Sequence, residues 1–246
     1  MHFQPLQPFR AQSNFLCSPQ FLAPTALSLF KLINAPTSLS LSPVKTHNSA
    51  PRIRAVSLDE LPPNALRRKI DPKWRGGFSL GVDLGMSRTG VALSKGFSVR
   101  PVTVLELRGQ KLELELLDIA LQEEADEFII GLPKSCDGME TPQSNKVRSV
   151  AGRLAVRAAE RGWRVYLQDE HGTTAEAADR MISMGINRST RQGKIDAYAA
   201  MMLLERYFSL AGHGTELVLP KNLDLQEKLH RGPPKDIDFF PEEFEG

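Results

Sequence analysis

The fold of this chain is decided by residues 78–94, which read FSLGVDLGMSRTGVALS. Residues 78–83 are apolar on both faces and interrupted only by small residues, which predicts a buried strand. Residues 85–90 predict a turn and residues 89–94 a second strand, so the stretch is expected to form a hairpin. Its single acid, Asp83, ends the first strand, where an unpaired buried carboxylate is costly.

Outward from this hairpin, the sequence predicts a mixed α/β fold. Further strands are expected at residues 99–107, 127–131 and 164–168, and helices at 111–125, 142–162, 173–185 and 194–210. Three hairpin-linked strands followed by strand–helix crossovers imply a mixed sheet with helices on its faces. Thr173 and Glu176 fit a capping box at the start of the third helix.

Composition excludes several classes of protein. The 246 residues contain 31 Lys and Arg against 29 Asp and Glu, and 41% are hydrophobic, which is ordinary for a globular protein. No run of about 18 apolar residues suggests a membrane span, and two cysteines, Cys17 and Cys136, exclude a disulfide scaffold. A sugar-kinase or Hsp70-like ATPase would need a second Gly-rich phosphate loop, which the chain lacks.

The first 58 residues differ from the rest. They contain no Asp or Glu and are rich in Ser and Pro, which is typical of an organelle transit peptide. Ser and Pro outnumber Arg, which favours the chloroplast over the mitochondrion, with cleavage expected near Ala55. The alternative is a disordered native tail. Residues 59–76 are expected to be a linker, and the polar, acidic residues 211–246 a disordered tail.

Four acids fall at the ends of expected elements. Asp83 closes the first strand, Asp169 and Glu170 close the last strand, and Asp196 lies in the first turn of the last helix. Carboxylates gathered at one edge of a sheet suit Mg²⁺ or Mn²⁺, and such sites hydrolyse phosphodiesters. The alternative for Asp196 is a stabilising interaction with the helix dipole, and for Asp169 and Glu170 a solvated strand end.

Four motifs, in this order, resemble those of the YqgF (RuvX-type) family and span residues 77–210. They are GVDLGMSRTGVA at 81–92, IGLP at 130–133, DEHGTTAEA at 169–177 and KIDAYAA at 194–200. The resemblance implies an RNase H-like fold, with a five-stranded mixed sheet flanked by helices. It also implies a metal-dependent nuclease whose catalytic, metal-binding acids are Asp83, Glu170 and Asp196, with Asp169 beside them. Strand alternation places Asp169 and Glu170 on opposite faces, and we favour Glu170 as the ligand.

The basic residues predict where nucleic acid binds. The candidates for phosphate contact are Arg88, Lys134, Arg188, Arg191 and Lys194. A stripe along the 142–162 helix is either a further phosphate contact or a solvated face; it comprises Lys146, Arg153, Arg157 and Arg161. His171 stands where the family usually has Arg, so one bidentate phosphate contact is missing.

Three functions remain open at this point. The first is a nuclease acting on precursor rRNA in the chloroplast, since bacterial members of the family are linked to maturation of the 16S 5′ end. The second is a Holliday-junction resolvase acting on branched DNA, which would require a dimer. The third is a non-catalytic rRNA-binding assembly factor. The expected partner is therefore precursor rRNA or branched DNA and no membrane, and the protein is expected to be a monomer or homodimer.

Overall fold

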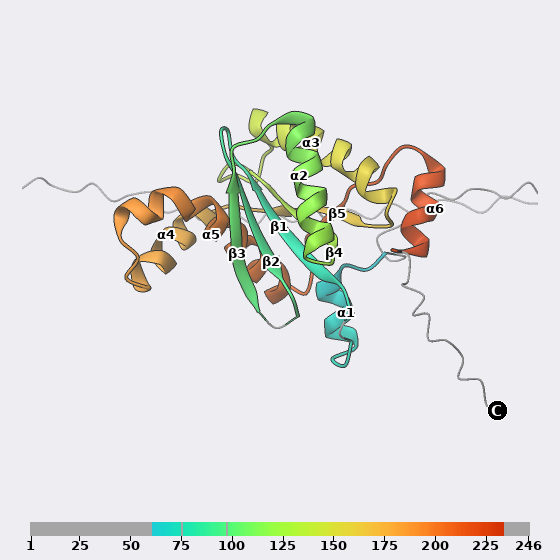
Figure 1. Ribbon diagram of the computed structural model, residues 1–246, viewed down its shortest axis with the longest axis horizontal. Helices are drawn as coiled ribbons and strands as arrows, with labels where there is room; N and C mark the ends of the chain where they lie inside the picture. The colour runs from blue at the N-terminus through green and yellow to red at the C-terminus, as the bar shows by residue number, and fades with distance from the viewer. Residues whose placement is uncertain (1–60, 75, 97, 234–246) are drawn as a thin grey trace, which may run out of the picture. The chain divides into compact units, whose positions relative to one another are not determined.

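The predicted hairpin forms the centre of the sheet. A computed structural model describes residues 61–74, 76–96 and 98–233 (Figure 1), which all belong to the unit comprising residues 50–246. The first three strands are β1 (Phe78–Leu84), β2 (Thr89–Ser94) and β3 (Val99–Leu105). They pair in antiparallel fashion, with Asp83 of β1 opposite Gly90 of β2.

Two parallel strands extend the sheet on the other side of β1. β4 (Ala125–Leu132) pairs with β1, and β5 (Arg164–Asp169) pairs with β4. The strand order is β3-β2-β1-β4-β5-β6, in which β6 (Glu216–Leu217) is a two-residue antiparallel addition. The predicted RNase H-like α/β fold is confirmed, with this short sixth strand added to the five that were expected.

Helices cover both faces of the sheet, as predicted (Figure 1). On one face lie α2 (Gly109–Gln122) and α3 (Pro142–Ala159), whose apolar residues share a core with Leu80, Val82 and Leu84 of β1. On the other face α5 (Arg188–Ser209) packs against the sheet, and α4 (Thr173–Ser183) packs against α5. No helix in the described ranges is long and apolar enough to cross a membrane.

Glycines allow α5 to lie unusually close to β1 and β2. A Cβ atom on Gly90 would sit 1.8 Å from the backbone oxygen of Asp196, and one on Gly81 would sit 2.6 Å from Cγ of Leu204. Any side chain at these positions would push the helix away, so the glycines mark a close backbone approach. The helix therefore brings Asp196 to the strand pair that carries Asp83.

One predicted helix start and one predicted helix cap are wrong. α5 begins at Arg188 rather than at residue 194, because Asn187 caps it by accepting a hydrogen bond from the backbone N–H of Thr190. Asp196 consequently lies well inside α5, and the helix-dipole interpretation does not apply to it. The capping box of α4 is absent: Gly172, in the left-handed conformation, is the N-cap, and Glu176 pairs with Arg206 instead.

The predicted linker and tail contain ordered helices in their described parts. α1 (Asn64–Ile70) precedes β1, and α6 (Leu223–Arg231) follows β6. Leu229 of α6 is buried in a small apolar cluster with Leu61 and Ala159. Short helices of this kind draw their stability from tertiary contacts, which a local sequence pattern does not reveal. Residues 1–58 and 234–246 lie outside the described residues.

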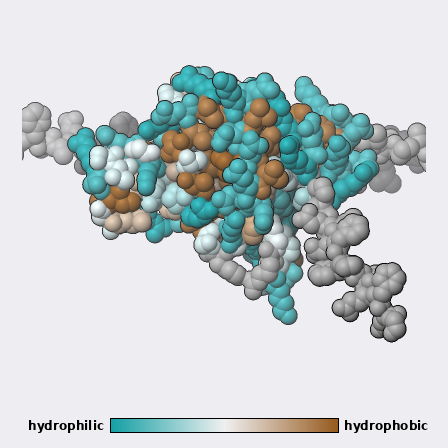
Figure 2. Space-filling view, in the orientation of Figure 1, coloured by the Kyte–Doolittle hydropathy of each residue, from teal (hydrophilic) through white to brown (hydrophobic). Residues whose placement is uncertain are grey.

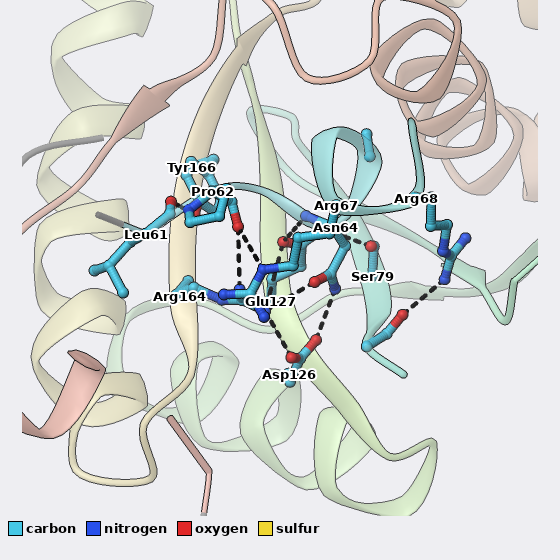
Figure 3. Close-up of polar contacts among 12 residues, drawn as sticks. Leu61, Pro62, Asn64, Arg67, Arg68, Ser79, Asp126, Glu127, Arg164 and Tyr166 are labelled. Carbon is cyan, nitrogen blue, oxygen red and sulfur yellow. Dashed lines mark hydrogen bonds and ion pairs between the residues drawn. The ribbon is translucent and has the colours of Figure 1, made fainter. Parts of the chain in front are cut away.

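A buried polar network attaches α1 to the amino ends of β1, β4 and β5 (Figure 3). Glu127, which is fully buried, accepts hydrogen bonds from the Asn64 backbone N–H at 3.0 Å, from Ser79 Oγ at 2.6 Å and from the Tyr207 hydroxyl at 2.7 Å. Arg164 lies 3.8 Å from Glu127 and donates to Asp126 at 2.6 Å. We call these residues the amino-edge network: Asn64, Ser79, Asp126, Glu127, Arg164 and Tyr207.

Candidate active site

The sheet brings two of the predicted acids to its opposite edge. β1, β4 and β5 run parallel, so their carboxyl ends meet there. Asp83 is the penultimate residue of β1, and Glu170 directly follows β5. The backbone N–H of Glu170 donates to the carbonyl of Leu132, the last residue of β4, at 3.3 Å. The sheet therefore fixes the backbone positions from which the side chains of Asp83 and Glu170 extend.

Gly131 lets the Glu170 side chain cross β4. A Cβ atom on Gly131 would lie only 1.8 Å from Oε2 of Glu170, so the carboxylate occupies the space that a side chain would fill. Because β4 lies between β1 and β5, this position directs Glu170 toward Asp83. Asp169 is engaged differently: it accepts from the His171 backbone N–H at 2.9 Å and lies 3.8 Å from Lys134 Nζ.

The two acids share an environment that disfavours their charged forms. Burial, and secondarily the charge of Asp196, raises the pKa of Asp83 from 3.8 to about 6. Burial, followed by the charges of Asp83 and Asp169, raises the pKa of Glu170 from 4.5 to about 8. Oε2 of Glu170 is buried and has no hydrogen-bond partner among the described residues. In the absence of a cation the two carboxyls therefore resist carrying negative charge together. We call Asp83 and Glu170 the carboxyl-edge pair.

Asp196 is close to the pair but is already held by a cation. Its Oδ2 lies 2.8 Å from Nε of Arg88, and Arg88 also donates to the backbone carbonyl of Gln192 at 3.0 Å. The turn between β1 and β2 is therefore tied to α5 through Arg88. Of the three predicted metal ligands, Asp83 and Glu170 have no basic partner among the described residues, whereas Asp196 forms an ion pair with Arg88.

The donor set suits a divalent cation only in part. Carboxylate oxygens are the ligands that Mg²⁺ and Mn²⁺ prefer, and the partnerless Oε2 of Glu170 is one such oxygen. Within the described part of the chain, however, no three Asp, Glu, His or Cys side chains are gathered closely enough to hold a metal ion. The carboxyl-edge pair fits a cation as it stands, and Asp196 fits only after Arg88 releases it.

The predicted phosphate contacts are distributed unevenly. Arg88 and Lys134 are engaged by Asp196 and Asp169, as described above. Arg191 donates to the carbonyl of Ile186 at 2.8 Å, at the start of α5. Arg188 and Lys194 are exposed on α5 and make no ion pair within the described residues. These last two are the cations most available to a polyanion.

The basic stripe on α3 has a structural role that the sequence did not indicate. Arg153 and Arg157 lie 2.6 and 3.2 Å from the carboxylate of Glu113, whose side chain is 1% exposed on α2. The Arg161 guanidinium instead lies over the ring of Trp163. At Arg153 and Arg157 the stripe joins α2 to α3, and Arg161, just beyond α3, covers an aromatic ring, so neither the phosphate contact nor the plain solvated face describes these three. Lys146 is exposed and keeps both interpretations.

Two residues of the site were missed by sequence reasoning. Arg206 donates to the carbonyls of Asp169 and His171 at 3.3 and 2.8 Å, and so holds the loop that carries Glu170. No local signal marks an Arg on a helix 35 residues away as a partner of this loop. Gly131 could have been found, because a glycine inside an apolar strand often marks a close approach. The exposed His171 contributes only backbone groups to these contacts.

Comparison with known proteins agrees with this arrangement. The family model described as "RuvX: Holliday junction resolvase" matches residues 77–210. A Cronobacter sakazakii protein named "Putative pre-16S rRNA nuclease" is 32% identical over 139 residues, which cover 55% of this chain and 99% of the relative. An Escherichia coli O157:H7 protein of the same name is 33% identical over 135 residues, 54% of this chain and 96% of the relative.

Solved structures give a more distant likeness. RuvC of Thermus thermophilus in complex with a Holliday junction substrate is 14% identical, with a TM-score of 0.40, over 58% of this chain and 99% of that one. The yeast mitochondrial Holliday junction resolvase Ydc2 is 15% identical, with a TM-score of 0.31, over 64% and 91%. The family match spans more than half of the chain and includes all four predicted acids. The chain belongs to the RuvX family.

Proposed function

We propose that this protein is a metal-dependent nuclease that hydrolyses phosphodiester bonds at the carboxyl edge of the sheet. The observation that carries the proposal is the carboxylate of Glu170, buried without a hydrogen-bond partner over Gly131 and directed toward Asp83. A buried anion left open in this way is expensive, and a divalent cation is the partner that balances it. Membership of the RuvX family and the names of its relatives support the same activity.

Asp83 and Glu170 would hold the Mg²⁺ or Mn²⁺ ion, and Asp196 would join them once Arg88 turns away. When bound, the ion supplies an activated water and stabilises the leaving oxygen. The protein's own residues do the positioning. Arg206 fixes the loop that carries Glu170, and the approach of α5 to Gly90 fixes Asp196. Arg88, released from Asp196, would be free to contact the substrate phosphate with its planar guanidinium.

The substrate that we propose is the 5′ region of precursor 16S rRNA. The relatives' names support it, and exposed Arg188 and Lys194 on α5 supply cations for a phosphate backbone. An excess of acids over bases beyond residue 58 argues against tight binding to any nucleic acid regardless of its form. Recognition of the RNA is therefore expected to depend on the residues around the carboxyl-edge pair and not on the overall charge of the protein.

The proposal is tested by cleavage of precursor 16S rRNA with Mg²⁺, with Mn²⁺ and with EDTA. Asp83→Asn is expected to abolish cleavage while the protein stays folded. Asp118→Asn, at an exposed position on α2, is the matched control and is expected to cleave like the wild type. Cleavage that survives EDTA, or full activity in Asp83→Asn, would contradict the proposal.

A four-way DNA junction belongs in the same assay. The description of the matching family model names a Holliday junction resolvase, which favours this second substrate. The same acids would serve, but two sites would have to act on one junction. Cutting of the junction alone would transfer the proposal to DNA. Binding of precursor rRNA by a wild type that cuts neither substrate would instead support the assembly-factor interpretation.

We also propose that the protein acts in the chloroplast. The support is the composition of residues 1–58, which lack acids and are rich in Ser and Pro. Residues 1–58 fused to a fluorescent protein are expected to direct it to chloroplasts in leaf cells. Fluorescence in mitochondria would favour the other organelle, and diffuse fluorescence would show that the segment is no targeting signal.

A further inference from the structure

A pocket opens beside the carboxyl-edge pair, on the opposite face of the sheet. It has a volume of about 290 Å³ and lies where the turn after β1 meets the first turns of α2 and α3. Its wall includes Leu84, the residue that follows Asp83 in β1. Successive residues of a strand point to opposite faces of the sheet. Asp83 and Leu84 therefore lie at the same end of β1, but the acids are on one face of the sheet and the pocket is on the other.

The pocket combines apolar walls with a basic rim. Leu84, Leu112 and Val147 are buried and present hydrocarbon, while Arg108 and Lys146 are exposed at the opening. In Figure 2, apolar residues gather on the face turned to the viewer, which carries α2 and α3. A ligand that suits this site has a flat or compact apolar body and carries negative charge beside it.

Gln143 adds an unused hydrogen-bond acceptor at the pocket wall. Its Nε2 donates to the carbonyl of Leu84 at 3.1 Å, which fixes the orientation of the side-chain amide. Its Oε1 is buried and has no hydrogen-bond partner among the described residues. A buried acceptor without a donor costs free energy. A ligand whose entry uncovers this oxygen and brings an N–H group to it would recover that cost.

We propose that the pocket binds one unpaired nucleobase of the nucleic-acid substrate, close to the bond that is cut. A base has apolar faces for the half-buried Leu107 and Val150, an N–H edge for Gln143 Oε1, and phosphates on both sides for Arg108 and Lys146. A base held in a duplex is stacked and paired, so it must leave the helix before it can enter. This inference rests on the proposed nuclease function, and it specifies a substrate that is single-stranded beside the cleavage site.

Binding by the non-cleaving Asp83→Asn protein tests the pocket separately from catalysis. The probes are fluorescent single-stranded RNA oligonucleotides of the precursor 16S 5′ region, each with one abasic position. One abasic position is expected to weaken binding about tenfold, because it removes the apolar surface that the base would bury in the pocket. The other abasic positions are expected to bind like the intact oligonucleotide.

Two substitutions connect this effect to the pocket. Val150→Phe fills the pocket from α3 and is expected to remove the tenfold difference between intact and abasic RNA. Val156→Phe, at a 41% exposed position on the same helix, is the matched control and is expected to retain it. Gln143→Met, which preserves size but removes the acceptor, is expected to lose most of the difference without filling the pocket.

The inference is overturned when no abasic position weakens binding, or when Val150→Phe and Gln143→Met both keep the full difference. A protein that cleaves precursor rRNA but shows no abasic effect would retain the proposed function and lose only the pocket. A protein that discriminates intact from abasic RNA but never cleaves would retain the pocket and lose the nuclease.

Discussion

Glu127 and Glu170 place carboxylates at opposite edges of the same sheet, and their surroundings differ completely. Glu127 receives three hydrogen bonds and lies 3.8 Å from Arg164. Glu170 has a buried oxygen with no partner among the described residues, and acidic neighbours raise its pKa further. Burial, with a smaller effect from the charge of Asp126, also raises the pKa of Glu127, but the charge of Arg164 and the hydrogen bonds from Ser79 and Asn64 oppose that rise.

This difference shows how a buried carboxylate with a structural role can be distinguished from one with a functional role. A carboxylate whose surroundings supply every donor has nothing left to bind, and its role is to join segments of the chain. A carboxylate that is buried beside other acids costs stability in the absence of a cation. Glu127 is the first kind and Glu170 the second, although Glu127 lies near the start of β4 and Glu170 lies against its end. Each of the following predictions breaks or sharpens this contrast.

The largest effect is expected from breaking the amino-edge network. Arg164→Met leaves Glu127 and Asp126 without their cation, and it should lower the free energy of unfolding by about 3–5 kcal/mol. Urea unfolding measures this change. Arg180→Met is the control, because the exposed pair of Arg180 with Glu205 should contribute less than about 1 kcal/mol. Equal costs for the two variants would refute the assigned role of the network.

The next effect concerns the space over Gly131. Gly131→Ala places a methyl group on the Glu170 carboxylate and forces it away from Asp83. Cleavage of precursor rRNA should fall by roughly 100-fold, as expected for a displaced catalytic group. Gly152→Ala on α3 meets no atom within 4 Å and should cleave normally, with a gain in stability of about 0.5–1 kcal/mol. Wild-type rates in Gly131→Ala would show that Glu170 does not act from this position.

A pH dependence should distinguish the carboxyl-edge pair when metal is absent. The carboxyls ionise near 3.8 and 4.5 when unfolded, but at about 6 and 8 when folded. The folded state therefore binds more protons in this window, so the contribution of this pair to stability is fully present below about pH 4 and is lost as pH rises through 6 and 8. Glu170→Gln removes this titration, so between pH 4.5 and 8 it should gain roughly 4 kcal/mol of stability relative to the wild type.

Thermal unfolding of the wild type and Glu170→Gln between pH 4.5 and 8.5, in EDTA, measures the difference between them. Other titrating groups are common to both proteins and cancel in the comparison. Addition of Mg²⁺ should stabilise the wild type more at pH 8 than at pH 5, since the ion needs ionised ligands. A constant difference between the two proteins across the range would contradict the raised pKa of Glu170.

The smallest effect is expected at His171. His171→Arg restores the residue that the family usually carries, beside the carboxyl-edge pair. RNA affinity should rise by less than about 1 kcal/mol, and the dependence of binding on salt should steepen by about one phosphate contact. His213→Arg, also at an exposed position, is the control and should change neither quantity beyond the general effect of one added charge. Identical salt slopes would place position 171 away from the substrate.

Much of the central sheet could be predicted from the sequence, because its signals are local. The hairpin of β1 and β2, the strand that ends at Asp83 and the helices on both faces follow from apolar patterns and turn residues. The position of Glu170 beside Asp83 could not be predicted from local patterns, because it depends on the absence of a side chain at Gly131 in a neighbouring strand. Strand alternation distinguished Glu170 from Asp169 but did not reveal this contact.

The remaining features depend on contacts between distant parts of the chain. Arg88 reaches Asp196 across 108 positions, and Asn64 reaches Glu127 across 63. α1 and α6 lie in segments whose composition suggested a linker and a tail, and only tertiary packing makes them helical. The start of α5 at Arg188 was hidden because its first residues are polar and basic, although Asn187 is a good N-cap.

The amino-edge network has a consequence for how the chain can be shortened. The carbonyl of Leu61 accepts a hydrogen bond from the fully buried Tyr166, and the carbonyl of Pro62 accepts one from Arg164. Both residues precede the stretch shared with the family, yet they close the edge of its sheet. A protease that cuts upstream of Leu61 leaves both of these carbonyl groups in place. One that cuts within the following few residues removes the backbone groups on which Glu127 and Arg164 depend, and its product is a substrate for further degradation.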